Sequence, residues 1–418
     1  MKINKKSVQS IVAVIATFIS LGAAASATAA VRYVNPDGVC GGNLPCYTTI
    51  QAAINAASSG DTINVADGIY HESVNVNKSL TLHGAQAGVD ARNRSGAESV
   101  IDNSCSPVQI TADNVILDGF TVQGSTQSDP CTIVGIWMNP GFSGTQGGAQ
   151  ILNNIVQNNI SGIEFDNTGT IPAKVQFNLI RSNNNPGPGS GNGIETSFGL
   201  VNATIDNNKF IGQTSSSMVV EAPASSVAIS NNTLDAGIAL FSTTNTTITG
   251  NSSIGNVSDG TIYLGGGDSG ITISSNVLNT GIEGIVIENP YSVGPNSSVT
   301  ISPNNCIAGN STNGLRVAHL GYAGAAHSLS AVNNWWGAAN GPKYNGAGPG
   351  TGDNIADPDL VVNFSPFLTS KTGTPCAPPP VGPPTNANQC KNGGWQTFNT
   401  PRSFKNQGDC IQYVNTGK

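Results

Sequence analysis

A short pattern of apolar and polar residues repeats along residues 134–319 of the chain. One half of the pattern is an apolar residue, two variable residues and an asparagine, usually followed by another apolar residue. The asparagines of this half are Asn154, Asn178, Asn208, Asn232, Asn251, Asn276 and Asn304. They recur every ~19 to 30 residues, which is the period of a solenoid with stacked coils.

The other half of the pattern is a glycine, an apolar residue, a variable residue and a second apolar residue. It begins at Gly135, Gly162, Gly193, Gly237, Gly284 and Gly314, and segments 218–220 and 262–264 take its place in two further coils. Alternation over four or five residues predicts β-strands, and no helical stripe fits between the two halves. Each coil is therefore predicted to hold two or three short strands. One coil cannot bury its apolar face alone, so the coils must stack.

The recurring asparagine has a physical role in such a stack. Equivalent residues of neighbouring coils lie about 4.8 Å apart, the spacing of adjacent strands. A side-chain amide both donates and accepts, so a column of asparagines forms a hydrogen-bond ladder along the stack. Asparagine also tolerates the left-handed backbone that a sharp corner needs.

The N-terminal part of the solenoid is predicted to carry a cap. Residues 32–34 form a first strand, and residues 50–57 form a short amphipathic helix with Thr49 at its N-cap. Such a helix covers the open end of the stack, which would otherwise expose strand edges and core. Strands at 62–65, 73–76 and 79–82 follow the helix.

Two segments resemble a known superfamily. Residues 49–54, with Gly60-Asp61-Thr62-Ile63 and the run 78–82, resemble the N-terminal cap and first coil of right-handed parallel β-helix proteins. These form the pectin-lyase-like superfamily, which includes pectin methylesterases and periplasmic carbohydrate-binding β-helix proteins. Asn333-Asn334-Trp335-Trp336-Gly337 resembles a late-coil motif of bacterial β-helix repeat proteins. The resemblance implies an all-β, right-handed parallel β-helix over residues 31–369 with a short N-terminal capping helix.

The resemblance does not select an activity, because one scaffold hosts many. The sequence lacks Asp-Phe-Ile-Phe-Gly of pectin methylesterases, and Gly-His-Gly and the Asp-Asp pair of polygalacturonases. It also lacks Trp-Ile-Asp-His and Arg-x-Pro-x-x-Arg of pectate lyases. These absences argue against those named enzymes and leave other activities open.

The two ends of the chain differ from the solenoid. Residues 1–29 have the basic start, apolar centre and Ala27-Thr28-Ala29 site of a signal peptide, so the mature protein is predicted to be extracellular, at the cell surface or periplasmic. No later stretch is apolar enough to span a membrane. A Pro-rich linker is predicted at 370–386 and a small two-cysteine module at 387–418. Wall attachment, partner docking and export handling are all open roles for this module.

Charge and cysteine content narrow the class of protein. Removing the three lysines of the signal peptide takes the formal charge from −7 to −10, which does not suit a nucleic-acid binder. Eight cysteines in a secreted chain predict disulfides. Their spacing suggests the local pairs Cys40 with Cys46, Cys105 with Cys131, Cys306 with Cys376, and Cys390 with Cys410.

Candidate site residues follow from which side chains point outward. In the Gly-containing half of the pattern, the third residue and the residue after the fourth lie on the outer face of one sheet. The first outward column is Trp137, Glu164, Glu195, Val219, Ala239, Tyr263, Val286 and Arg316. The second is Asn139, Asp166, Ser197, Glu221, Phe241, Gly265, Glu288 and Ala318.

Four acids gather on three successive coils of these columns. They are Glu164, Asp166, Glu195 and Glu221. Strand geometry puts Glu195 roughly 8 Å from Glu221, within the range of an inverting glycosidase pair. Crowded carboxylates raise one another's pKa, which suits a general acid.

Further side chains on the same face suit a sugar ligand. Trp137, Phe241 and Tyr263 could stack on sugar rings, and Arg316 beside Glu288 forms either an ion pair or a substrate clamp. The sequence therefore predicts a protein that binds or cleaves an extracellular polysaccharide or cell-surface glycan.

Several alternatives stay open at this point. The acids could hold Ca²⁺, because carboxylates are its preferred ligands, or they could be solvated surface residues. A polyuronate lyase is less favoured, because the repeats hold few fixed cations. The protein could also bind carbohydrate without turnover, or be a non-catalytic surface or adhesion protein. The sequence does not indicate its oligomeric state.

Overall fold

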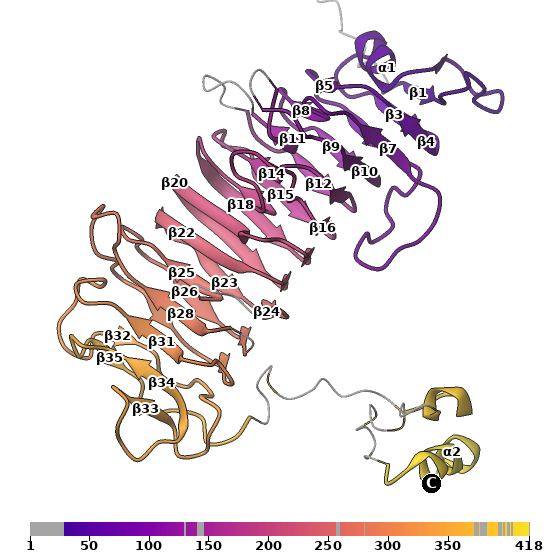
Figure 1. Ribbon diagram of the computed structural model, residues 1–418. Coiled ribbons are helices and arrows are strands. Elements are labelled where there is room, and N and C mark those ends of the chain that lie inside the picture. Colours follow the sequence, from indigo (N-terminus) through magenta and orange to yellow (C-terminus); the bar gives the residue numbers. More distant parts are fainter. Residues whose placement is uncertain are drawn as a thin grey trace, which may run out of the picture.

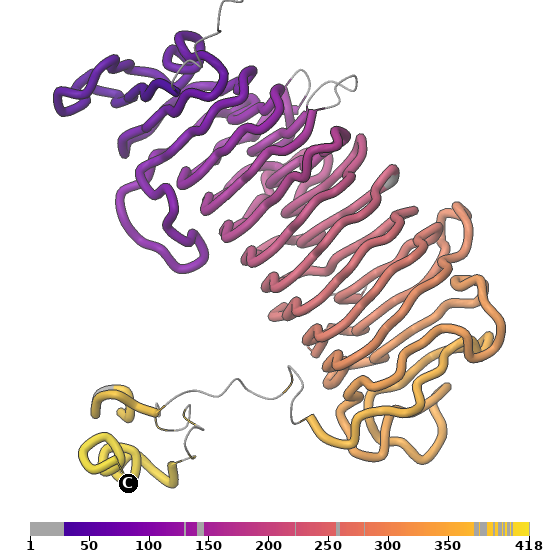
Figure 2. The backbone as a smooth tube through the Cα atoms, turned by 180° about the vertical axis from the view of Figure 1, so that it is seen from behind, coloured from indigo at the N-terminus to yellow at the C-terminus, as the bar shows by residue number. Residues whose placement is uncertain are grey.

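The computed structural model describes residues 29–128, 131–139, 146–255, 260–279, 281–371, 376, 383–391, 395, 398, 402 and 404–417. The predicted signal peptide lies outside these residues apart from Ala29, and the predicted linker is described only in part. The strands of residues 31–363 stack as the coils of a parallel β-helix (Figure 1), as the repeats predict. Figure 2 shows the same coils from behind, following one another along a single axis.

Each full coil contributes strands to three parallel sheets. The first, here called the groove sheet, contains β5 (Val74–Val76), β8 (Val108–Ile110), β11 (Val134–Met138), β14 (Ser161–Phe165), β17 (Ile194–Glu195), the first parts of β20 (Ser216–Ser230) and β22 (Gly237–Thr244), β25 (Ile262–Leu264), β28 (Glu283–Ile287), β31 (Asn313–Val317) and β34 (Gly352–Ala356), with β33 (Pro342–Tyr344) beside β34.

The second sheet contains β1 (Val31–Val34), β3 (Thr62–Val65), β6 (Thr81–His83), β9 (Ile116–Asp118), β12 (Gln150–Leu152), β15 (Ala173–Gln176), β18 (Leu200–Asp206), the later part of β20, β23 (Thr247–Thr249), β26 (Thr272–Ser274), β29 (Thr300–Ile301), β32 (Leu329–Ser330) and β35 (Val362–Asn363), with β2 (Cys46–Tyr47) beside β1. The long strand β20 runs through both sheets, so one hydrogen-bonded surface joins them.

The third sheet contains β4 (Gly68–Tyr70), β7 (Ser99–Asp102), β10 (Phe120–Gln123), β13 (Ile155–Gln157), β16 (Leu179–Arg181), β19 (Lys209–Ile211), β21 (Thr233–Leu234), β24 (Ser252–Ser253), β27 (Val277–Leu278) and β30 (Cys306–Ile307). Inward side chains of all three sheets fill the interior in columns. One such column is Leu117, Ile151, Val175, Ile205, Ile229, Ile248, Ile273 and Ile301, all fully buried.

A ladder of buried asparagines follows the corner between the second and third sheets. Its members are Asn154, Asn178, Asn208, Asn232, Asn251, Asn276, Asn305 and Asn334. Oδ1 of Asn208, for example, accepts hydrogen bonds from the backbone N (3.1 Å) and Nδ2 (2.9 Å) of Asn178. Nδ2 of Asn208 donates to the carbonyl of Val175 at 2.8 Å, so the amide satisfies buried backbone groups of the preceding coil.

The prediction that Asn304 belongs to this ladder is wrong by one residue. Asn305 is the ladder member, bonded to Asn276 and Asn334, whereas Asn304 is exposed with a φ of 64°. Three residues separate Ile301 from Asn305, where two separate Ile273 from Asn276. The additional residue lengthens the turn and moves the ladder position along the chain.

The predicted capping helix is present as α1 (Ile50–Ala56), and the Thr49 side chain accepts from the Ala52 N–H. Both of its ends are held by side chains of the first coils. The Glu72 carboxylate accepts from the N–H groups of Ile50 and Gln51 (2.7 and 2.9 Å). Nζ of Lys78 donates to carbonyls in the last turn. Opposite charges thus meet the two ends of the helix dipole.

All four predicted disulfides form: Cys40–Cys46, Cys105–Cys131, Cys306–Cys376 and Cys390–Cys410. Disulfides of this number are consistent with an oxidising compartment outside the cytoplasm. The last one joins η1 (Ala387–Cys390) to α2 (Gln407–Thr416), where Phe398 and Phe404 pack against the bridge. In the described part of the chain, no helix is long and apolar enough to cross a membrane.

Candidate functional site

The outer face of the groove sheet carries the predicted column of side chains in one register. Trp137 pairs with Glu164, Glu164 with Glu195, and Glu195 with Val219. The column continues through Ala239, Tyr263, Val286 and Arg316. Successive members are therefore one strand spacing apart, about 4.8 Å.

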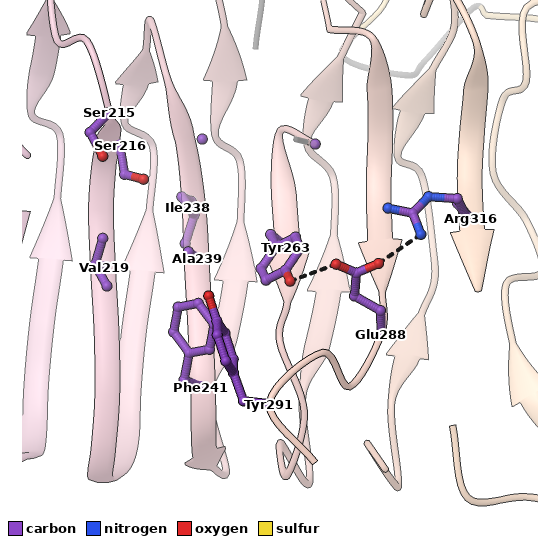
Figure 3. Close-up of a pocket in the computed structure, with 12 residues that line it drawn as sticks. Ser215, Ser216, Val219, Ile238, Ala239, Phe241, Tyr263, Glu288, Tyr291 and Arg316 are labelled. Carbon is purple, nitrogen blue, oxygen red and sulfur yellow. Dashed lines mark hydrogen bonds and ion pairs between the residues drawn. The ribbon is translucent and has the colours of Figure 1, made fainter. Parts of the chain in front are cut away.

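A hollow of about 290 Å³ lies over the later part of this column (Figure 3). It is lined by Ser215, Ser216, Val219, Gly237, Ile238, Ala239, Phe241, Gly260, Tyr263, Glu288, Tyr291 and Arg316. A second hollow of about 410 Å³ shares Phe241 and Tyr291 with it and adds Glu221, Ser242 and Val293. The two hollows together are called the groove below.

Three aromatic rings form one wall of the groove. The Phe241 ring centroid lies 5.7 Å from that of Tyr263 and 5.8 Å from that of Tyr291, with tilted planes. Tyr291 is 69 % exposed, so its ring is open to a ligand. Gly265 lies beneath the rings, because a Cβ there would come within 2.2 Å of Phe241 Cε1. The absence of a side chain at this position thus allows the wall to form.

A chain of polar contacts forms the charged end of the groove (Figure 3). The Tyr263 hydroxyl donates to Glu288 Oε1 at 2.6 Å, and Arg316 Nη1 donates to Glu288 Oε2 at 2.7 Å. Arg316 Nε also donates to Glu283 Oε2 at 2.7 Å, and Asn313 donates to the other Glu283 oxygen. Arg316 therefore bridges two carboxylates. The predicted Arg316–Glu288 ion pair is present.

These contacts determine the charge of Glu288. Burial opposes its ionisation, but the hydrogen bonds from Tyr263 and Arg316 outweigh burial and lower the pKa of Glu288. Burial and the neighbouring Glu288 raise the pKa of Tyr263. Near neutral pH, Glu288 is therefore an ionised acceptor and Tyr263 a neutral donor.

The predicted acids lie mostly beneath the surface. Glu164, Asp166 and Glu195 are 6 %, 0 % and 8 % exposed, so the alternative that they are solvated surface residues is wrong for these three. The turn before β17 covers Glu195: Asn192 Nδ2 donates to Glu195 Oε2 at 2.9 Å, and a Cβ on Gly189 would lie 2.9 Å from the same oxygen. The repeat pattern predicts which side chains point outward from a strand, but it does not predict which loops fold over them.

Burial has a strong effect on these acids. It raises the pKa of Glu164 to about 9, with further contributions from the charges of Asp166 and Glu195. Burial also raises the pKa of Asp166, against N–H donors from Phe198 and Ser197, and of Glu195, against a hydrogen bond from Asn192. One oxygen of each carboxyl (Glu164 Oε1, Asp166 Oδ2 and Glu195 Oε1) has no hydrogen-bond partner in the structure. Glu164 is therefore protonated near neutral pH.

The acids of the described residues do not form a metal-binding group. Among them, no group of three or more His, Cys, Asp or Glu side chains is arranged to hold a metal ion. The residues present do not fit a calcium site, and no metal enters the function proposed below.

The structure brings together four of the five predicted sugar-contacting residues. Phe241, Tyr263, Glu288 and Arg316 line the groove, whereas Trp137 stands beside Glu164, outside the residues that line it. Sequence reasoning missed two contributors. Tyr291 lies in the turn after β28, where the repeat pattern gives no register. Glu283 lies at the start of β28, immediately before the repeat glycine.

No protein-family model matches the sequence, and no curated protein matches it. Structures with a similar course of chain include the A-module of mannuronan C-5 epimerase AlgE4 from Azotobacter vinelandii, at 16 % identity and a TM-score of 0.47, covering 81 % of this chain and 100 % of that one.

An alginate lyase from Paenibacillus sp. str. FPU-7 is similar at 12 % identity and a TM-score of 0.44, covering 75 % of this chain and 96 % of that one. A mannuronic acid specific polysaccharide family 6 lyase from human gut microbiota is similar at 12 % identity and a TM-score of 0.46, covering 93 % and 100 %. These identities and scores are too low to transfer an activity to this chain.

Proposed function

We propose that this protein binds an extracellular polysaccharide in the groove. The observation that supports it is the pairing of an aromatic wall (Phe241, Tyr263, Tyr291) with an ionised acceptor, Glu288, in one hollow. Sugar rings present an apolar face and a rim of hydroxyl groups. An aromatic surface with a few convergent polar groups is the arrangement that recognises such ligands.

The dimensions of the groove suit a polymer better than a single sugar. Its lining comes from five successive coils, represented by Val219, Ala239, Tyr263, Glu288 and Arg316. Five coils span roughly 19 Å at the strand spacing of a sheet. A groove of this length accommodates several sugar units along the axis of the stack.

Hydrolysis by Glu195 and Glu221 is a second candidate function. Burial raises the pKa of Glu195, with Glu221 contributing, as a general acid requires. Glu221 is exposed and lines the groove, where it could activate water. Glu195 itself is covered by the turn at Asn192, so this reaction requires that turn to move. The simpler proposal is therefore binding.

Binding is tested by titrating the mature protein with oligosaccharides from a panel of neutral and acidic polysaccharides in a calorimeter. Tyr291→Ala is expected to weaken binding about tenfold or more, since stacked aromatics carry much of such binding energy. The matched control is Ile69→Ala, which removes an exposed apolar side chain on the third sheet and should not change affinity. Equal affinity of the wild type and Tyr291→Ala would exclude the groove as the site.

Hydrolysis is tested on the same panel by assaying new reducing ends. Turnover that is lost in both Glu195→Gln and Glu221→Gln would support the second candidate, and unsaturated products would indicate a lyase instead. Binding without turnover would indicate that the protein binds carbohydrate but does not cleave it. If no carbohydrate binds, but cell attachment is lost on deleting residues 387–418, the protein is an adhesion or surface protein.

A further inference from the structure

We infer that the groove selects polysaccharides of uncharged sugar units and excludes polyuronates. This inference rests on the proposed function and names the substrate class of the same groove. It follows from the charges around the groove and from how each charge is already paired.

The positive charge at the groove is already paired. Among the described residues that line the groove, Arg316 is the one with a positive charge. Its Nε and Nη1 are both engaged, by Glu283 and Glu288, at 2.7 Å each. A uronate carboxylate that approached Arg316 would therefore meet a guanidinium group whose charge two carboxylates already balance. Displacing Glu283, which is largely buried, would leave an uncompensated charge in the protein.

The groove region carries a net negative charge. Glu221, Glu283 and Glu288 contribute three formal negative charges and Arg316 one positive charge, so the groove region carries −2. The lowered pKa of Glu288 keeps that residue ionised across the neutral range. The chain as a whole is also acidic, at −7. A polyanion therefore meets repulsion both at long range and in the groove.

The polar groups of the groove match the hydroxyl groups of a neutral sugar. A sugar hydroxyl donates well to a carboxylate, and such charge-assisted bonds are short and strong. Glu221 and Glu288 supply acceptors on two sides of the aromatic wall. Ser215 and Ser216 add hydroxyl groups that can donate or accept at the far end. Neutral sugars thus satisfy the polar groups of the groove, whereas a uronate would replace some donors with further acceptors.

The test compares hexasaccharides of neutral hexoses or pentoses with hexasaccharides of galacturonate and mannuronate. We expect the best neutral ligand to bind at least about tenfold more tightly than either uronate at low salt, with a smaller gap at about 1 M salt, where charges are screened. Glu221→Gln should strengthen uronate binding several-fold, and Glu221→Lys more. Asp67→Asn removes an exposed acid far along the stack and serves as the matched control.

Three other outcomes separate the inference from the proposed function. Tighter uronate binding that depends on Tyr291 would overturn the inference and leave the proposed function standing. Equal binding of both classes, unaffected by Glu221→Lys, would also overturn it. Failure of every oligosaccharide to bind would reject the proposed function, and the inference with it.

Discussion

The hydroxyl group of Tyr263 donates a 2.6 Å hydrogen bond to Glu288, joining two neighbouring coils on the floor of the groove. Tyr263 comes from β25, and Glu288 directly follows β28. The bond, together with the one from Arg316, lowers the pKa of the acid, and it restrains the Tyr263 ring through its hydroxyl group. One contact therefore contributes both to the charge of Glu288 and to the position of Tyr263.

Removing this hydroxyl should weaken ligand binding more than folding. In Tyr263→Phe, Glu288 loses one of its two donors, so we expect its pKa to rise and the affinity for sugar to fall several-fold. The free energy of unfolding should fall by about 1 kcal/mol, as for one hydrogen bond. Calorimetric titrations at several pH values measure the first effect, and urea denaturation measures the second.

Tyr344→Phe is the matched control for that experiment. The Tyr344 hydroxyl donates to Asp357 at 2.9 Å, away from the groove. Tyr344→Phe should lower the free energy of unfolding by a similar amount and leave the affinity for sugar unchanged. If both variants lose affinity equally, the effect of Tyr263 is general and not local to the groove.

Stability should depend on pH through the buried acids. The folded-state pKa of Glu164 is raised by burial from 4.5 to about 9, so the folded protein holds a proton that the unfolded chain releases between these values. The free energy of unfolding therefore falls as pH rises through this window. Denaturation midpoints should be higher at pH 5 than at pH 8, and Glu164→Gln should flatten the difference. A wild-type midpoint that is independent of pH would contradict this assignment.

The glycine beneath the aromatic wall gives a test of shape alone. An added methyl group in Gly265→Ala would meet the Phe241 ring at 2.2 Å and the Tyr263 ring at 2.9 Å. We expect both rings to shift and sugar affinity to fall about tenfold or more. In a Phe241→Ala background, the same change should have a smaller further effect on affinity and stability, because only the contact with the Tyr263 ring remains. A double-mutant cycle measures this coupling, and simple additivity would show that the methyl group acts elsewhere.

The asparagine ladder predicts opposite outcomes for two adjacent residues. Asn305 is fully buried, and its amide bonds to the coils on both sides, so Asn305→Ala should lower the free energy of unfolding by about 3 kcal/mol. Asn304 is exposed with a φ of 64°, so Asn304→Gly should be nearly neutral. Urea denaturation of both variants checks the prediction. Similar losses would show that the ladder is not what stabilises this coil.

Much of the fold was predictable because its repeats are local. Alternating apolar residues, the ladder asparagines and the Thr49 cap each appear in a few consecutive residues, and each predicted element is present. The prediction of Asn304 in place of Asn305 was wrong because Ile301 and Asn304 also fit the repeat pattern. The extra turn residue leaves no other mark in the sequence. The four disulfides were also predictable, since each joins a cysteine to the next one along the chain.

The site was less predictable because it depends on the turns between strands. The repeat pattern predicted Phe241, Tyr263 and Arg316 on one face, because parallel strands of successive coils keep the same register. Nothing in the repeat indicates that a turn ending at Asn192 covers Glu195, or that Tyr291 reaches back to the sheet. Turn conformation is set by contacts that are distant in sequence, and the single sequence carries no signal for them.

The asparagine ladder does not fix the number of residues in a coil, so a whole coil can be added or removed. Consecutive ladder bonds span 19 residues from Asn232 to Asn251 but 30 from Asn178 to Asn208. Each of these coils contributes one asparagine to the ladder, and the coils differ in the number of residues between successive ladder positions. Duplicating the 19-residue coil would lengthen the groove sheet by one strand spacing, about 4.8 Å, and each ladder asparagine would again have a partner in the next coil. The length of the groove sheet can therefore change only in whole strand spacings, one coil at a time.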